Sequence, residues 1–132
     1  MNIVVSQKQE RVPVTVFRIK GNIDVSSYQQ LQVQAEEAFK AGTRYLLLDL
    51  TQVPYISSAG LRALHYIFTL LRTDAAKESD SAISKGLRDG TFRSPHLKLL
   101  NPSPGVLNAL STAGFDMYLE IHRDLQEAVA SF

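Results

Sequence analysis

The sequence has no cysteine and no tryptophan among its 132 residues. The absence of cysteine excludes disulfide bonds and thiol catalysis, and it fits a reducing compartment. No charge of either sign dominates, because 14 Lys and Arg residues face 13 Asp and Glu residues and the basic ones are scattered along the chain. A chain without a basic cluster gives no reason to expect nucleic-acid binding.

Long hydrophobic runs are also missing. No apolar stretch approaches the roughly 18 residues that a membrane-spanning helix needs, and the chain begins without the basic and apolar segments of a secretion signal. We therefore expect a cytoplasmic protein without a membrane segment. A length of 132 residues, 45% of them hydrophobic, predicts a single domain with its own core.

Several catalytic and cofactor motifs are absent. Two glycine-rich motifs bind nucleotide phosphates, Gly-x-x-x-x-Gly-Lys-Ser/Thr and Gly-x-Gly-x-x-Gly, and the sequence contains neither. We therefore expect no nucleotide cofactor. No His and acidic residues show the spacing of metal ligands, so we expect no metal. A serine hydrolase is disfavoured because Ser58 lacks the first glycine of a nucleophile elbow, and because His65, His96 and His122 are each better explained as surface or loop residues.

Strand and helix patterns alternate along the chain. Helical spacing is clearest where Leu61, Leu64, Phe68 and Leu71 recur on one line. The predicted strands cover residues 3–7, 12–20, 45–50, 96–100 and 117–121. The predicted helices cover residues 28–41, 58–72, 103–113 and 124–132. Strands that alternate with helices in this way predict an α/β protein with a mostly parallel sheet.

Residues 73–95 differ in composition from the rest of the chain. They are polar, rich in Ser, Gly and Asp, and balanced in charge. Such a composition predicts a long surface loop that the core does not need. Ile83, Leu87 and Phe92 leave open the alternative that part of the segment forms a short helix against the domain.

The most informative segment is Tyr55-Ile-Ser-Ser-Ala-Gly-Leu-Arg62, which joins a buried strand to the second predicted helix. Serine is a favoured helix cap because its oxygen accepts a hydrogen bond from an unpaired backbone N–H. If Ser57 caps the helix, Ser58 lies in its first turn, where the helix dipole would stabilise an attached phosphate. On these residues alone, an ordinary capping serine is the more common explanation.

This segment resembles the signature of the STAS domain, the fold of anti-sigma factor antagonists. The resemblance includes Asp49-Leu-Thr-Gln-Val53 before it, Gly21-Asn-Ile-Asp24 upstream, and the segment from His96 to Leu107. It implies a four- to five-stranded, mostly parallel sheet with about four helices and the N-terminal strand at one edge. It also implies a single STAS domain over residues 1–132, in which residues 73–95 form an insertion.

The resemblance further implies a binding switch rather than an enzyme. In this family, the serine that matches Ser58 is phosphorylated by a partner kinase of the histidine-kinase-like ATPase fold, which is itself the anti-sigma factor. The unphosphorylated form binds that kinase and releases its target, and a serine phosphatase resets the switch. The residues expected to bind the partner are Asp24, Ser57, Ser58, Ala59, Gly60 and Arg62.

Three alternatives remain open on the sequence. Asp24 could serve only as a cap for the first helix, and Ser57 is a weak rival acceptor for the phosphate. The whole domain could also be an unphosphorylated STAS scaffold or adaptor, in a stress-signalling assembly or beside a transporter.

Overall fold

A computed structural model describes residues 1–73 and 93–132, so most of the predicted 73–95 insertion lies outside the described residues. Within these residues, five strands form one sheet in the order β1-β2-β3-β4-β5. Strand β1 runs antiparallel to β2, and every other pair is parallel, which confirms the predicted fold class. The strands are β1 (Asn2–Gln9), β2 (Pro13–Lys20), β3 (Leu46–Gln52), β4 (Leu97–Leu100) and β5 (Ile121–His122).

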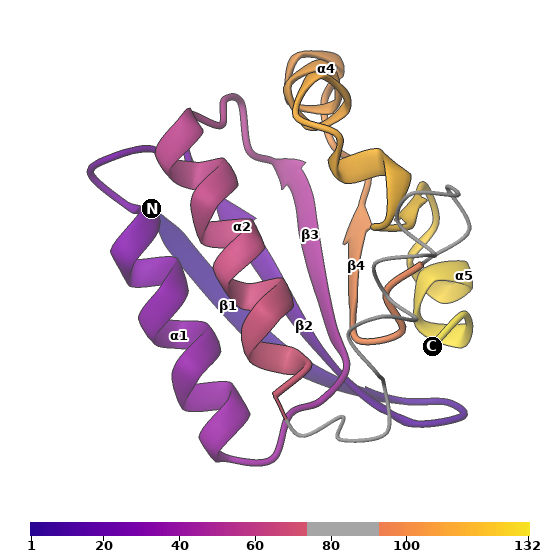
Figure 1. The fold of residues 1–132 in the computed structure, drawn as a ribbon. Coiled ribbons are helices and arrows are strands. Elements are labelled where there is room, and N and C mark those ends of the chain that lie inside the picture. The colour runs from indigo at the N-terminus through magenta and orange to yellow at the C-terminus, as the bar shows by residue number, and fades with distance from the viewer. Residues whose placement is uncertain (74–92) are drawn as a thin grey trace.

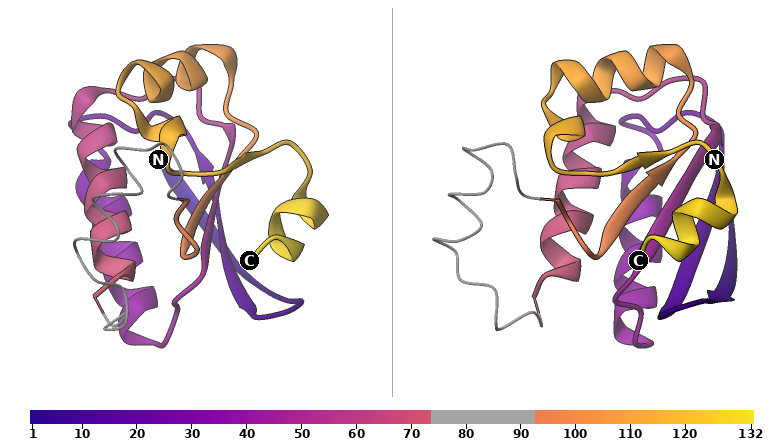
Figure 2. Two further views of the ribbon diagram at one scale, coloured as in Figure 1. Left: turned by 45° about the vertical axis from the view of Figure 1, so that its right-hand side comes forward. Right: turned by 90° about the vertical axis from the view of Figure 1, so that its right-hand side faces the viewer.

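Helices cover both faces of this sheet. Within the described ranges they are α1 (Tyr28–Lys40), α2 (Ser58–Leu71), α4 (Pro104–Thr112), α5 (Leu125–Ala130) and the short 3-10 helix η1 (Phe115–Met117). Helices α1 and α2 lie side by side on one face and α5 covers the other, while α4 lies beyond the end of β4 (Figures 1 and 2). None of these helices is long and apolar enough to cross a membrane.

The apolar run in β3 is explained by this layered arrangement. Leu46, Leu48 and Leu50 are buried beneath α1 and α2, whereas Leu47 belongs to a second, smaller core beneath α5. A parallel strand that is covered on both faces needs apolar side chains at successive positions rather than at alternate ones.

The predicted last strand exists, but its predicted bounds of 117–121 were wrong. Phe115–Met117 forms the 3-10 helix, the Leu119 backbone N–H donates to the Phe115 carbonyl at 2.9 Å, and only Ile121–His122 pairs with β4. The turn allows Phe115 and Leu119 to be buried in the same core. Alternating apolar residues resembled a strand because a single tight turn produces a similar pattern over so few positions.

A buried lysine holds the C-terminal helix against the sheet. Lys98 in β4 is only 3% exposed. Its ammonium group donates to the Ser131 carbonyl at 2.8 Å and to the Ser131 hydroxyl at 3.0 Å, and it lies 3.2 Å from a Glu120 carboxylate oxygen. The same ammonium lies 4.9 Å from the centre of the Phe132 ring. Each of its three N–H groups therefore has an acceptor, as a buried charge requires.

Candidate functional site

Helix α2 begins within the segment that the sequence singled out. Ser57 is the N-cap, and its hydroxyl oxygen accepts a hydrogen bond from the Gly60 N–H at 3.2 Å. Ser58 is the first residue of the helix, and its side chain is exposed. This confirms the predicted cap. Within the described residues the Ser58 hydroxyl has no hydrogen-bond partner. Ser57 therefore caps the helix, and the Ser58 hydroxyl is left exposed to solvent.

Backbone hydrogen bonds join this helix start to the loop that precedes α1. The Ile23 N–H donates to the Tyr55 carbonyl at 3.0 Å, and the Ser57 N–H donates to the Ile23 carbonyl at 2.9 Å. The loop leaves β2 at Gly21, whose φ of 113° is a left-handed conformation that favours glycine. Neighbouring parallel strands end at the same edge of the sheet, and these bonds bring their two loops into contact there.

Gly60 is the residue that allows this close approach. It is buried in the first turn of α2. A Cβ atom at this position would lie 2.5 Å from the Ile23 carbonyl oxygen and 2.7 Å from an Ile56 side-chain carbon. Both distances are shorter than van der Waals contact. Gly60 therefore shapes the surface from below rather than facing a partner directly.

Asp24 occupies the other side of the junction. One of its carboxylate oxygens accepts from the Ser26 hydroxyl at 2.6 Å, the Ser26 N–H at 3.0 Å and the Ser27 hydroxyl at 3.3 Å. These bonds, led by that from the Ser26 hydroxyl, lower the pKa of Asp24, so its charged form is favoured. The N-cap of α1 is Ser27, and the Asp24 carboxylate closes the turn just before it. Its second oxygen has no hydrogen bond within the described residues.

The two loops enclose a shallow hollow of about 460 Å³. Five of the six residues predicted to bind a partner line it, and only Gly60 does not. Val25 and Tyr55, which the sequence analysis did not select, also line it and are 77% and 55% exposed. In the sequence, Val25 directly follows the Gly21–Asp24 motif and Tyr55 precedes the two serines, so an apolar residue beside each motif could have indicated them. The lining residues are Asp24, Val25, Ser26, Tyr55, Ser57, Ser58, Ala59 and Arg62.

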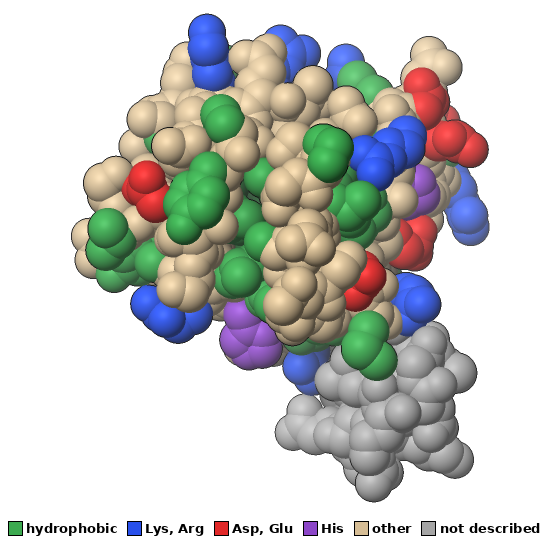
Figure 3. All heavy atoms as spheres, turned by 90° about the horizontal axis from the view of Figure 1, so that it is seen from above, with side chains coloured by type: hydrophobic (Ala, Val, Ile, Leu, Met, Phe, Trp, Pro, Cys, Tyr) green, Lys and Arg blue, Asp and Glu red, His purple; other side chains and the backbone are tan. Residues whose placement is uncertain are grey.

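Figure 3 shows this end of the molecule, where hydrophobic patches lie between charged groups. Arg62 is exposed and follows Ser58 by four positions, so the two side chains lie one helical turn apart on the same face of α2. No acidic side chain within residues 1–73 and 93–132 forms an ion pair with Arg62. The hollow thus has the carboxylate of Asp24 at its edge, together with a hydroxyl and a guanidinium that have no partner among the described residues.

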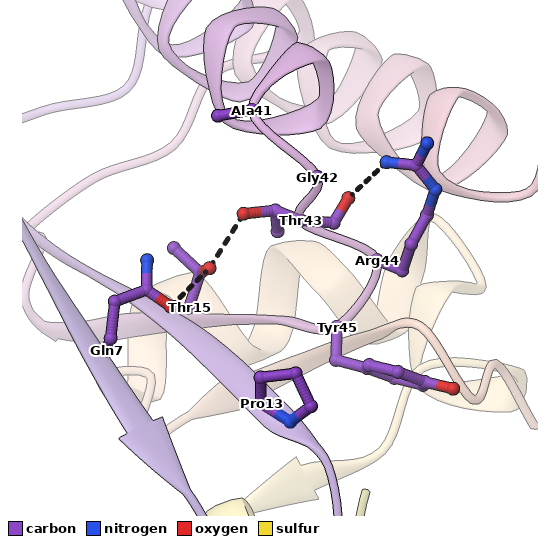
Figure 4. Close-up of a pocket in the computed structure, with 8 residues that line it drawn as sticks. All are labelled: Gln7, Pro13, Thr15, Ala41, Gly42, Thr43, Arg44 and Tyr45. Atoms are coloured by element: carbon purple, nitrogen blue, oxygen red, sulfur yellow. Dashed lines mark hydrogen bonds between the residues drawn. The ribbon is translucent and has the colours of Figure 1, made fainter.

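A separate hollow lies at the opposite end of the sheet, where β3 begins (Figure 4). The Thr15 hydroxyl donates to the Gln7 side-chain oxygen at 3.1 Å and shares a 2.8 Å hydrogen bond with the Thr43 hydroxyl. The Arg44 guanidinium donates to the carbonyls of Thr43 and Phe39, which ties down the end of α1. These polar groups already bond to one another, so their arrangement is structural.

The histidines lie away from Ser58. His65 is seven residues further along α2, about 10 Å along the helix axis. His96 shares a 3.0 Å hydrogen bond with the Arg44 carbonyl at the other end of β3. His122 contacts Glu120 at 3.1 Å and the Ser131 hydroxyl at 3.3 Å through the same ring nitrogen, Nε2. A catalytic triad needs the acid and the serine on opposite ring nitrogens, so this cluster does not form one.

Comparisons with solved structures support the fold. An anti-sigma factor antagonist from Mycobacterium paratuberculosis has a TM-score of 0.67 at 16% identity, over 98% of this chain and 93% of that one. Bacillus SpoIIAA in its phosphorylated form has a TM-score of 0.62 at 16% identity, over 96% of both chains. A sulfate transporter family protein from Wolinella succinogenes has a TM-score of 0.57 at 19% identity, over 89% of this chain and 82% of that one.

At these identities the structural likeness establishes the fold alone. No curated protein matches the sequence. Residues 4–77, which are more than half of the sequence and include both loops of the hollow, match the STAS domain, and the chain therefore belongs to the STAS domain family.

Proposed function

We propose that this protein is an anti-sigma factor antagonist whose binding is switched by phosphorylation of Ser58. Unphosphorylated, it binds an anti-sigma serine kinase of the histidine-kinase-like ATPase fold, and that kinase then releases its target. The observation that carries the proposal is the exposed, unbonded Ser58 hydroxyl at the start of α2, within one hollow that also holds Asp24 and Arg62. A related fold, Bacillus SpoIIAA, has been solved in phosphorylated and unphosphorylated forms.

The physical effect of the modification is a local change of charge. A phosphate adds about −1.5 to −2 charges and three acceptor oxygens. At the N-terminus of α2 it is stabilised by the helix dipole, so the domain itself tolerates it. A partner surface that fits the uncharged serine does not, because it would have to desolvate the new charge. A serine phosphatase restores the binding form, and the need for ATP places this cycle in the cytoplasm.

Phosphate transfer is expected at Ser58 and not at Ser57, because the Ser57 hydroxyl is engaged as the cap. Each serine kinase of this fold from the same genome is incubated with the protein and ATP, and the modified residue is mapped by mass spectrometry. Ser58→Ala should keep kinase binding and lose modification. Ser57→Ala should keep modification and lose about 1 kcal/mol of stability. Phosphate mainly on Ser57, or none with any kinase, would contradict the proposal.

Asp24→Ala is expected to slow phosphorylation at least several-fold, since its carboxylate lies in the same hollow as Ser58. The matched control is Asp124→Ala, which removes the N-cap of α5, where the carboxylate accepts from the Glu127 N–H at 3.0 Å. Initial rates of phosphate incorporation are measured for both variants at equal folded concentration. If Asp24→Ala is phosphorylated as fast as Asp124→Ala, then the Asp24 carboxylate only closes the turn before α1 and has no part in recognition by the kinase.

The second candidate is an unphosphorylated scaffold or adaptor. It is favoured by the likeness to a sulfate transporter family protein, because proteins other than anti-sigma factor antagonists therefore share this fold. The phosphorylation assay separates the two candidates, because a scaffold would keep its partner and take no phosphate from any of the kinases.

A further inference from the structure

An apolar hollow of about 440 Å³ lies along the exposed side of α2. We call it the α2 groove. Its residues recur one turn apart along the helix, and Phe115 of η1 closes one side. Phe115 is buried, whereas Leu61 is partly exposed and Tyr66 is 38% exposed. The lining residues are Leu61, Arg62, His65, Tyr66, Thr69 and Phe115.

Arg62 belongs to both hollows. It lines the α2 groove and also the hollow that contains Asp24 and Ser58. The two are therefore parts of one surface, which runs from the loop before α1 to the fourth turn of α2. From Ser58 to Thr69 this surface extends about 16 Å along the helix axis.

The charges around the groove specify what fits it. No lining residue is acidic, and Arg62 has no ion-pair partner in the described chain. Burial and the nearby carboxylate of Glu36, on α1, raise the pKa of Tyr66. The end of the groove nearest Ser58 is therefore positive, and its floor is apolar. A guanidinium pairs best with a carboxylate, and buried apolar side chains anchor protein interfaces.

We propose that the kinase places an apolar side chain in the α2 groove and an adjacent carboxylate on Arg62. This inference rests on the proposed function and extends its contact surface along three turns of α2. The same arrangement couples the groove to the switch. A phosphate on Ser58 lies one turn from Arg62, within reach of its guanidinium, and competes with the partner's carboxylate for it.

Thr69→Glu tests the groove at the end farthest from Ser58. Thr69 is exposed, so a carboxylate there is compatible with folding, but it places a negative charge where the partner's apolar side chain would lie. We expect it to weaken kinase binding about tenfold or more in titration calorimetry without ATP. The matched control is Val33→Glu, at an α1 position that is 51% exposed and lines neither hollow. Its affinity should equal that of the wild type.

Arg62→Ala should also weaken binding, and it should reduce the dependence of affinity on salt, because one ion pair is lost. Arg62→Lys should restore part of the affinity. If the wild type binds no kinase, the proposed function fails and this inference fails with it. If the wild type binds and is phosphorylated while Thr69→Glu binds as tightly as Val33→Glu, the α2 groove is not part of the interface, and the proposed function stands.

Discussion

Gly60→Ala is expected to lower the free energy of unfolding by about 3–5 kcal/mol, although alanine is the better helix former. The added methyl group would lie 2.5 Å from the Ile23 carbonyl oxygen, a backbone atom that cannot rotate away. The first turn of α2 must therefore move, which strains the hydrogen bond from the Ser57 N–H to that carbonyl. Overpacking and a weakened buried hydrogen bond each cost about 1–3 kcal/mol.

Gly105→Ala is the matched control for this substitution. Gly105 also lies in the first turn of a helix, α4, but a Cβ atom there meets nothing within 4 Å. Its replacement should be neutral or should stabilise the protein by up to about 1 kcal/mol. Urea unfolding of both variants measures the difference, and phosphorylation of Gly60→Ala shows whether the hollow is disturbed. Equal midpoints for the two variants would show that the junction adapts to the methyl group.

Lys98→Ala is expected to be the other strongly destabilising change, by about 2–4 kcal/mol. The substitution removes a nearly buried side chain and leaves the Ser131 carbonyl and the Glu120 carboxylate without their donor. Loss of one partner from a buried pair costs about 3–5 kcal/mol, and here the cost is reduced because Glu120 is 35% exposed. Helix α5 should then exchange its amide hydrogens faster than α2 does.

Lys98→Met separates the packing of the lysine from its charge. Methionine has a similar volume and remains against Phe132, so the loss should be smaller than with alanine. Lys20→Ala, at an exposed position in β2, is the control and should change stability by less than about 0.5 kcal/mol. The measurement is chemical unfolding combined with hydrogen exchange. An α5 that stays protected in Lys98→Ala would show that its apolar contacts alone hold it.

Local patterns in the sequence were sufficient to predict the strand-to-helix junctions. Ser57 was predicted as a cap from its position before a helical repeat, and the structure confirms it. The order of strands and helices likewise predicted a mostly parallel sheet. Both depend on residues that are neighbours in the chain, where propensity and periodicity are strong signals.

Contacts between distant segments were beyond such patterns. Lys98 alternates with Leu97 and Leu99 along β4, and its burial depends on α5, which covers that face of the sheet. Leu61 fell on the apolar line of its helix, yet it lines an open groove whose other wall comes from Phe115. That the two loops meet followed from the parallel sheet, but the need for glycine at position 60 did not, because the nearest atom that a Cβ would meet belongs to Ile23, 37 positions earlier. Each of these features is decided by tertiary packing.

The separation of Ser57 from Ser58 has a consequence for the durability of the domain. If a single hydroxyl both closed the helix and received the phosphate, every cycle of modification would fray α2 and expose part of the core. Here the Gly60 N–H donates to the Ser57 hydroxyl and not to Ser58, so the cap does not use the hydroxyl that is proposed to carry the phosphate. Under the proposed cycle, the domain would therefore gain and lose a phosphate without losing the cap of α2, and its resistance to proteolysis would stay the same.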